Sequence, residues 1–241
     1  EYFGVFGLPP HVWREAMRQG DKTLPECAEL ARRHRVTIIY PSLELQGNSC
    51  FNTVWIIGTD GEVAGRYRKV HLTLCERTKY GLVPGGVFPV FSAQGLDFGV
   101  MTCYDVYFPE SARILALRGA KALFCPSLQR AATAETISLQ VRARAYDNCV
   151  HVIRSSYGYP PNMPWSPGMM VGMSCIADPN GRLIANLGPD EGYLVREIPT
   201  TWVRSRRRSF EGEVESPREY LFEDRRPELY GPICQRGRSR A

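Results

Sequence analysis

The residue best placed for chemistry in this sequence is Cys103. It follows an apolar, strand-like stretch, Asp97–Thr102, and precedes a helix predicted to begin at Pro109, because proline is favoured in a first helical turn. A turn of this kind would expose the sulfur, and the nearby helix N-terminus would favour a thiolate. The backbone N–H of Tyr104 could then stabilise a developing oxyanion. We predict a nucleophilic cysteine here; a buried structural cysteine is the alternative.

A basic segment, Gly65–Leu72, supplies a candidate cation. Alternation along a strand would place Tyr67, Lys69 and His71 on one face. If that face turned into the site, Lys69 would be a fixed positive charge beside the sulfur. It would favour the thiolate and stabilise a tetrahedral oxyanion. The alternative interpretation is a solvated basic strand.

These two segments lie within an alternation of predicted strands and helices. Helices are expected over Pro9–Gln19, Asp21–His34, Pro109–Arg118 and Ala132–Asp147. Strands are expected over Val36–Leu43, Thr53–Thr59, Val63–Val70, Asp97–Thr102, Ala120–Cys125, Cys149–Ser155, Met170–Ala177 and Arg182–Leu187. Hairpin turns are expected at Asp60-Gly61 and Asp178–Gly181. The order predicts an α/β sandwich with mixed sheets.

Together the two chemical segments resemble the nitrilase, or carbon–nitrogen hydrolase, superfamily. The family marker Arg-Lys-x-His-Leu is met by Arg68–Leu72, and the marker Cys-Tyr-Asp-x-x-Phe-Pro-Glu by Cys103–Glu110. Weaker matches spread the resemblance over roughly residues 1–200, at Asn52-Thr53, Pro84-Gly85, Arg142–Ala145 with Asn148, Gly172–Ser174 and Asp178–Gly181. The resemblance implies an α-β-β-α sandwich that lacks its first strand and helix in this chain. Tyr104-Asp105 after the cysteine is similar to the amidase and carbamoylase branch.

The resemblance also implies a catalytic triad of glutamate, lysine and cysteine. Lys69 and Cys103 supply two members. Glu1 is the candidate base, because it begins the chain where the family glutamate should lie, and Glu44 is its rival. Glu76 matches a second family glutamate, which would hold the lysine or the substrate; a surface-loop glutamate is the alternative.

The implied activity is hydrolysis of a carbon–nitrogen bond in a small linear amide or N-carbamoyl compound. It would proceed through a cysteine acyl-enzyme, release ammonia or an amine, and need no metal or cofactor. Tyr107 and Trp165 are candidates for the wall of the substrate pocket. Nitrile hydrolysis or acyl transfer on the same triad is an alternative. So are a cysteine–histidine enzyme using His71 or His151, and a non-catalytic scaffold.

Composition narrows the class of protein further. The chain has 241 residues, 44% hydrophobic and 23% charged, which is ordinary for a globular protein. No apolar stretch approaches the roughly 18–20 residues that span a bilayer, so no membrane partner is expected. The eight cysteines include no Cys-x-x-Cys pair and the four histidines no metal-binding spacing. We therefore expect no metal, and reduced thiols in the cytoplasm.

Two parts of the chain are expected to differ in role. Residues 1–199 are the predicted carbon–nitrogen hydrolase domain, and residues 200–241 a C-terminal arm. The arm has ten arginines against seven acids, and this mixed charge argues against nucleic-acid binding. By resemblance, the arm would contact another subunit in a homodimer or larger homo-oligomer.

Overall fold

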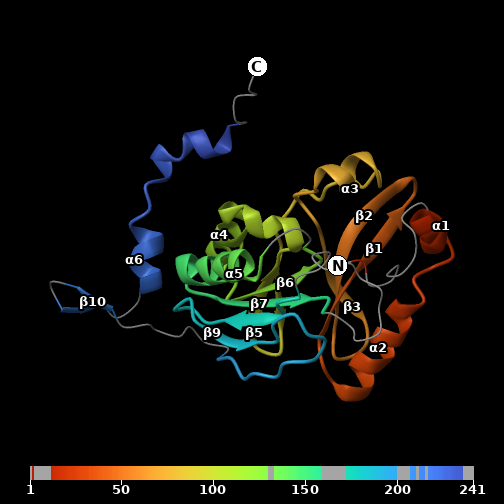
Figure 1. Cartoon of the computed structure of the whole chain (residues 1–241), viewed down its shortest axis with the longest axis horizontal. Helices are drawn as coiled ribbons and strands as arrows, with labels where there is room; N and C mark the ends of the chain where they lie inside the picture. The colour runs from red at the N-terminus through yellow and green to blue at the C-terminus, as the bar shows by residue number, and fades with distance from the viewer. Residues whose placement is uncertain are drawn as a thin grey trace. The chain divides into compact units, whose positions relative to one another are not determined.

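The structure is a computed structural model that describes residues 2, 12–129, 133–158, 172–199, 207–209, 212–214 and 217–235. Its chain divides into two compact units, residues 1–202 and residues 203–241 (Figure 1). Each unit is described by itself. No helix among the described residues is long and apolar enough to cross a membrane.

The first sheet of the larger unit has three antiparallel strands, β1 (Ile38–Gln46), β2 (Ser49–Ile57) and β3 (Val63–Arg68). A tight turn joins β2 to β3, and Gly61 takes a positive φ of 83° there, which glycine adopts at little cost. Helices α1 (Trp13–Arg18) and α2 (Thr23–His34) pack on this sheet. Ala31 of α2 is buried against Tyr40 of β1 and contributes to a local core.

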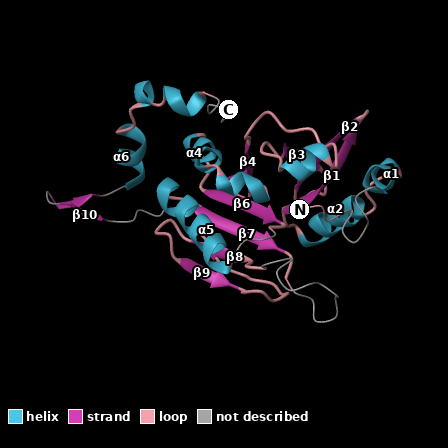
Figure 2. Cartoon of the chain, turned by 45° about the horizontal axis from the view of Figure 1, so that its top comes forward, coloured by secondary structure: helices cyan, strands magenta, loops and turns pink. Residues whose placement is uncertain are grey.

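The second sheet is mixed and has six strands in chain order. They are β4 (Val90–Ala93), β5 (Leu96–Val100), β6 (Ala122–Ser127), β7 (His151–Ser156), β8 (Cys175–Ala177) and β9 (Leu183–Asn186). The central strands β5, β6 and β7 run parallel, so their carboxyl ends share one edge. Helices α4 (Pro109–Leu117) and α5 (Ala134–Asn148) cover this sheet (Figure 2).

The two sheets face each other and the helices lie outside them, which makes the α-β-β-α sandwich that the sequence predicted. Tyr67 of β3 stacks on Phe88, which precedes β4, with ring centroids 5.8 Å apart. Gly65 faces Phe91 of β4 so closely that a Cβ atom would lie 2.7 Å from its ring. The absence of a side chain at position 65 therefore lets β3 approach the second sheet.

Several element boundaries differ from the prediction. The strand predicted over Val63–Val70 ends at Arg68, although the Lys69 amide still donates to Asn52 O at 2.8 Å. Helix α3 (Leu74–Thr78) and strand β4 were not predicted, because elements of five and four residues are too short to show a period. The residues expected to open the first helix, before Val12, lie outside the described part.

The smaller unit contains short elements in a stretch that shows no periodicity. A hairpin of β10 (Arg207–Ser209) and β11 (Gly212–Val214) precedes α6 (Pro217–Glu223). Two 3₁₀ turns follow, η4 (Pro227–Leu229) and η5 (Gly231–Cys234). Three-residue strands cannot produce a detectable alternation, so sequence reasoning could not find them.

Candidate active site

Cys103 lies just beyond the carboxyl end of β5, at the first residue of the 3₁₀ helix η3 (Cys103–Tyr107). Its φ is +48°, in the left-handed region that non-glycine residues seldom occupy and that is common at functional turns. Helix α4 follows at Pro109, as predicted. The expectation that the turn exposes this residue is wrong, because Cys103 is only 7% exposed. Asp105 of the same turn accepts hydrogen bonds from Tyr67 and from the His71 amide, so the segment that carries Lys69 contacts this turn.

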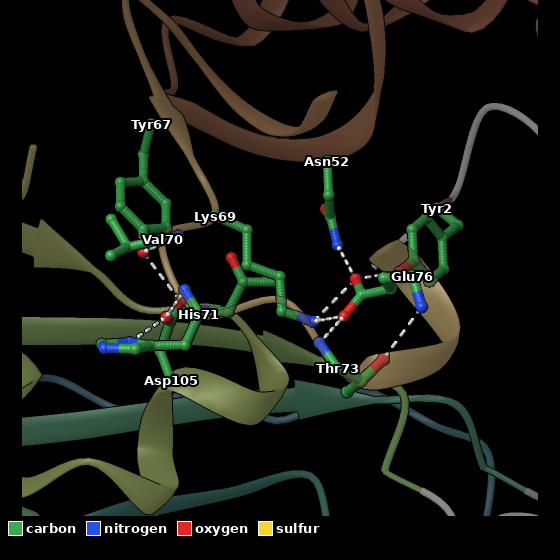
Figure 3. Close-up of polar contacts among 10 residues, drawn as sticks. Tyr2, Asn52, Tyr67, Lys69, Val70, His71, Thr73, Glu76 and Asp105 are labelled. Carbon is green, nitrogen blue, oxygen red and sulfur yellow. Dashed lines mark hydrogen bonds and ion pairs between the residues drawn. The ribbon is translucent and has the colours of Figure 1, made fainter. Parts of the chain in front are cut away.

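Lys69 is almost fully buried, with 1% exposure, and is paired with a carboxylate. Its Nζ lies 2.9 and 3.0 Å from the two oxygens of Glu76 (Figure 3). A buried ammonium is costly to desolvate unless it is paired and hydrogen-bonded, and this geometry supplies both. Tyr67 and Lys69 are buried, whereas Arg66 is exposed and Arg68 is half-buried, so the predicted alternation is confirmed from Arg66 to Lys69.

Glu76 is fixed by further donors, which sequence reasoning missed. Its carboxylate accepts from Asn52 Nδ2 at 3.1 Å, from the Thr73 amide at 2.7 Å and from the Tyr2 hydroxyl. Thr73 and Glu76 form a capping box that starts α3. The pattern Thr-x-x-Glu was the available signal for it. The surface-loop interpretation of Glu76 is therefore wrong, because the residue is buried.

Asp105 joins the lysine segment to the nucleophile turn. Its buried carboxylate accepts from Tyr67 Oη at 2.7 Å, from the His71 amide at 2.9 Å and from the Thr102 amide at 2.8 Å. It also contacts His71 Nδ1 at 2.9 Å. Tyr67 and His71 flank Lys69 in sequence, and Thr102 and Asp105 flank Cys103. One carboxylate thus ties the segment that carries Lys69 to the turn that carries Cys103.

The remaining predicted residues are placed unevenly. Glu1 and Trp165 lie outside the described residues. Tyr107 is 44% exposed, and its ring centroid is 5.4 Å from that of Tyr104. Tyr107 as a wall residue of the substrate pocket stays a prediction.

Glu44, the rival base, is engaged elsewhere. Its oxygens lie 2.6 and 2.8 Å from the Arg68 guanidinium, and it accepts from the Thr53 hydroxyl at 3.0 Å. Burial would raise the pKa of Glu44, but the hydrogen bonds from Arg68 and Thr53 outweigh it and hold the pKa below its usual value. Arg68 and Lys69 alternate along the chain and face opposite sides. The contact with Arg68 therefore argues against Glu44 as the partner of Lys69.

The structure also places the two histidines that were considered for a cysteine–histidine enzyme. His151 starts β7 and pairs with Ala122, which pairs with Phe98 in the middle of β5. Since Cys103 follows the carboxyl end of β5, the two residues are separated by roughly 15 Å along the strand direction. His71 contacts Asp105 and stacks on Phe108 with centroids 3.8 Å apart.

Among the described residues, no group of three or more histidine, cysteine, aspartate or glutamate side chains is arranged to hold a metal ion. The eight cysteines are thiols, none of them in a disulfide. Burial raises the pKa of Cys125 and raises the pKa of Cys175 to about 11, so both remain protonated near neutral pH.

Comparison with known proteins places the chain in a family. Residues 2–208 match the family described as carbon-nitrogen hydrolase, so the chain belongs to that family, as its two motifs predicted. The hydrolase in pqqF 5'region of Pseudomonas protegens is 32% identical over 200 residues. That match covers 82% of this chain and 64% of the relative, so the chain spans less than two thirds of that relative's length.

Two further proteins are similar over most of the chain. The N-carbamoylputrescine amidase of Solanum lycopersicum is 30% identical, covering 88% of this chain and 72% of that protein. A solved structure of a glutamate-to-glutamine mutant of the amidase from Nesterenkonia sp. AN1 is 26% identical, with a TM-score of 0.75. It covers 95% of this chain and 82% of that chain, and shows the result of Michael addition of acrylamide at the active site cysteine.

Proposed function

We propose that this protein is a thiol amidohydrolase that cleaves the carbon–nitrogen bond of a small linear amide or N-carbamoyl compound. Cys103 is the nucleophile, Lys69 the fixed cation and Glu1 the general base. The observation that carries the proposal is the buried Lys69–Glu76 pair on a segment that Asp105 ties to the cysteine turn. A buried, paired lysine beside a strained cysteine turn is suited to stabilise anionic sulfur and oxygen.

The reaction begins when Glu1 accepts the thiol proton of Cys103 and the sulfur attacks the carbonyl carbon. Lys69 and the Tyr104 amide stabilise the oxyanion. The carbon–nitrogen bond then breaks, and Glu1 returns the proton to the departing ammonia or amine. The same carboxylate deprotonates a water molecule, which attacks the thioester. This second attack releases the acid and restores the thiol.

Glu76 is assigned as a positioning residue. Its two oxygens already receive hydrogen bonds from Lys69, Asn52, Thr73 and Tyr2, so both are occupied in holding these groups in place. Support for Glu1 as the base comes from its covalent neighbour: Tyr2 is tied to the carboxylate that holds the proposed cation.

The substrate class is supported by the relatives, which include an N-carbamoylputrescine amidase and an amidase with a reactive active site cysteine. Both names describe hydrolysis at a carbon–nitrogen bond. Tyr104-Asp105 after the nucleophile also favours this branch over nitrile hydrolysis. The proposed assembly is a homo-oligomer in which residues 200–241 contact another subunit, and light scattering with and without these residues would test it.

The test is ammonia release from a panel of linear amides, N-carbamoyl amines and nitriles. Turnover of an amide or carbamoyl substrate is expected for the wild type, with a loss of at least 10³-fold in Cys103→Ala and in Lys69→Met. Lys121→Met is the matched control, because Lys121 pairs with Asp97 away from the site, partly exposed to solvent. Full activity in either site variant would contradict the assignment. Rapid turnover of nitriles alone would reverse the choice of substrate.

A further inference from the structure

Lys69 is held by its backbone as well as by its side chain. Strand β3 ends at Arg68, so Lys69 lies one residue beyond the strand. Its amide donates to Asn52 O on β2 at 2.8 Å, and its carbonyl accepts from the Gly85 amide at 2.8 Å. Gly85 thus supplies the hydrogen bond that a further strand of a sheet would supply. The backbone of the proposed cation is therefore fixed on both sides, by β2 and by the loop that contains Gly85.

The same loop, Leu82–Gly85, also holds the partner of the lysine. Glu76 lies in the five-residue helix α3, whose last carbonyls have no partner within the helix. The Leu82 amide donates to Glu76 O at 2.9 Å and satisfies one of them. The Val83 amide donates to Cys50 O at 2.8 Å and ties the loop to β2. Residues Leu82–Gly85 therefore contact the backbone of both members of the buried ion pair.

This contact is possible because position 85 has no side chain. A Cβ atom at Gly85 would lie 2.1 Å from Arg68 O and 2.8 Å from Arg68 C. Both are backbone atoms of the residue before Lys69, so they cannot move aside by a change of rotamer. The φ of Gly85 is not positive, so the requirement for glycine comes from the close approach and not from the backbone conformation.

We propose that Gly85 is a positioning residue for Lys69: its missing side chain lets the loop Leu82–Gly85 close on the lysine backbone and hold the Lys69–Glu76 pair in place. This inference rests on the proposed function, in which Lys69 is the fixed cation. A glycine has no side chain that could react, so Gly85 acts through the backbone of Lys69.

The next residue provides a matched control. Gly86 is exposed, and a Cβ atom there would meet nothing within 4 Å apart from its chain neighbours. Its φ is likewise not positive. Gly85→Ala and Gly86→Ala therefore make the same chemical change at adjacent positions, and only the first forces the loop away from Arg68 and Lys69.

The first experiment measures kcat and KM of both variants with the best amide substrate. Gly85→Ala should lower kcat about 10²-fold, because a displacement of about 1 Å in a group that supports the transition state can cost that much. KM should stay within about twofold, and Gly86→Ala should keep kcat within about twofold of the wild type. A wild-type kcat in folded Gly85→Ala would overturn the inference.

Iodoacetamide labelling of Cys103, followed by peptide mass spectrometry, separates positioning from a general effect on the fold and needs no substrate. Lys69→Met and Gly85→Ala should each slow the labelling. The double variant should label within about twofold of Lys69→Met alone, because no cation is left for Gly85 to place. If Gly85→Ala slowed labelling as much in the Lys69→Met background as in the wild type, its effect would be on the fold in general, and the inference would be overturned.

Amide hydrogen exchange of the wild type, followed residue by residue by NMR, tests the contact itself and does not require Gly85→Ala to fold. The Gly85 amide should exchange at least about 10²-fold more slowly than the Gly86 amide, because its hydrogen bond to Lys69 must break first. If Lys69→Met labels Cys103 as fast as the wild type and no substrate is turned over, the proposed function fails, and the exchange rates still decide whether Gly85 holds Lys69. Equal exchange at the two glycines would overturn the inference.

Discussion

Replacing Glu76 by glutamine removes the charge that accompanies the buried Lys69 ammonium and changes little else in shape. In the wild type the carboxylate receives Lys69 Nζ at 2.9 and 3.0 Å, Asn52 Nδ2 at 3.1 Å, the Thr73 amide at 2.7 Å and the Tyr2 hydroxyl. A glutamine has one acceptor oxygen, and its NH₂ group would face hydrogen-bond donors. At least one buried donor, and the lysine charge, would be left uncompensated.

The expected loss of stability follows from these unsatisfied donors and the unpaired lysine charge. Breaking a buried ion pair by removing one partner destabilises a protein by about 3–5 kcal/mol. For a unit of this size, each kcal/mol lowers the melting temperature by about 2–4 °C, so we expect a fall of about 6–20 °C. Without its carboxylate the buried lysine also favours the neutral amine. We therefore expect kcat to fall about 10²-fold, the effect of losing an oxyanion-stabilising group.

The assay combines thermal unfolding with ammonia release at a temperature where the variant is folded. Glu44→Gln is the matched control, because it removes a carboxylate from the partly exposed Arg68 cluster. It should lower stability by only about 1–2 kcal/mol and leave kcat within about twofold. If Glu76→Gln retains wild-type kcat, Lys69 does not depend on Glu76 and the proposed electrostatic role is refuted. If Glu44→Gln loses activity instead, the assignment of the rival base must be reversed.

Three further outcomes are expected. Asp105→Asn should lower the free energy of unfolding by about 2–4 kcal/mol and lower kcat, because the amide nitrogen cannot accept from the donors that the carboxylate holds. Urea unfolding measures the first effect and turnover the second. A wild-type kcat in the folded variant would exclude a bridging role for Asp105. Burial raises the pKa of Cys175 from 9.0 to about 11, so the neutral thiol stabilises the fold fully below pH 9, and this contribution is lost as pH rises through 11. Urea unfolding should show the wild type losing about 2 kcal/mol more than Cys175→Val between pH 8 and pH 10.5, and equal losses would contradict the shift. Burial lowers the pKa of His151 below 6.5, so the neutral imidazole stabilises the fold above that pH, and this stabilisation is lost on acidification. His151→Phe should therefore lose less stability than the wild type between pH 7 and pH 5. A steeper loss in the variant would argue against a buried neutral imidazole.

The sequence was most informative where a short motif has one structural meaning. The strand–turn–helix pattern located the Cys103 turn, and alternation in the basic segment predicted that Lys69 shares a face with Tyr67. The sandwich followed from the order of strands and helices. These are local signals, in which periodicity or turn chemistry reports on neighbouring residues.

The contacts that assemble the site were beyond local reasoning. Asp105 receives hydrogen bonds from Tyr67 and His71, which precede it by 38 and 34 residues, and no periodicity reports such a contact. The burial of Cys103 was also missed, because it depends on contacts between distant parts of the chain.

The central claim is that Cys103, supported by Lys69, forms an acyl-enzyme while breaking a carbon–nitrogen bond. The most direct measurement is acid-quench mass spectrometry of the enzyme during turnover of its best amide substrate, with digestion to locate the added acyl group. We expect the acyl mass on the peptide that contains Cys103, and its absence in Lys69→Met and Cys103→Ala. Continued ammonia release by Cys103→Ala, or an acyl group on a different residue, would contradict the account.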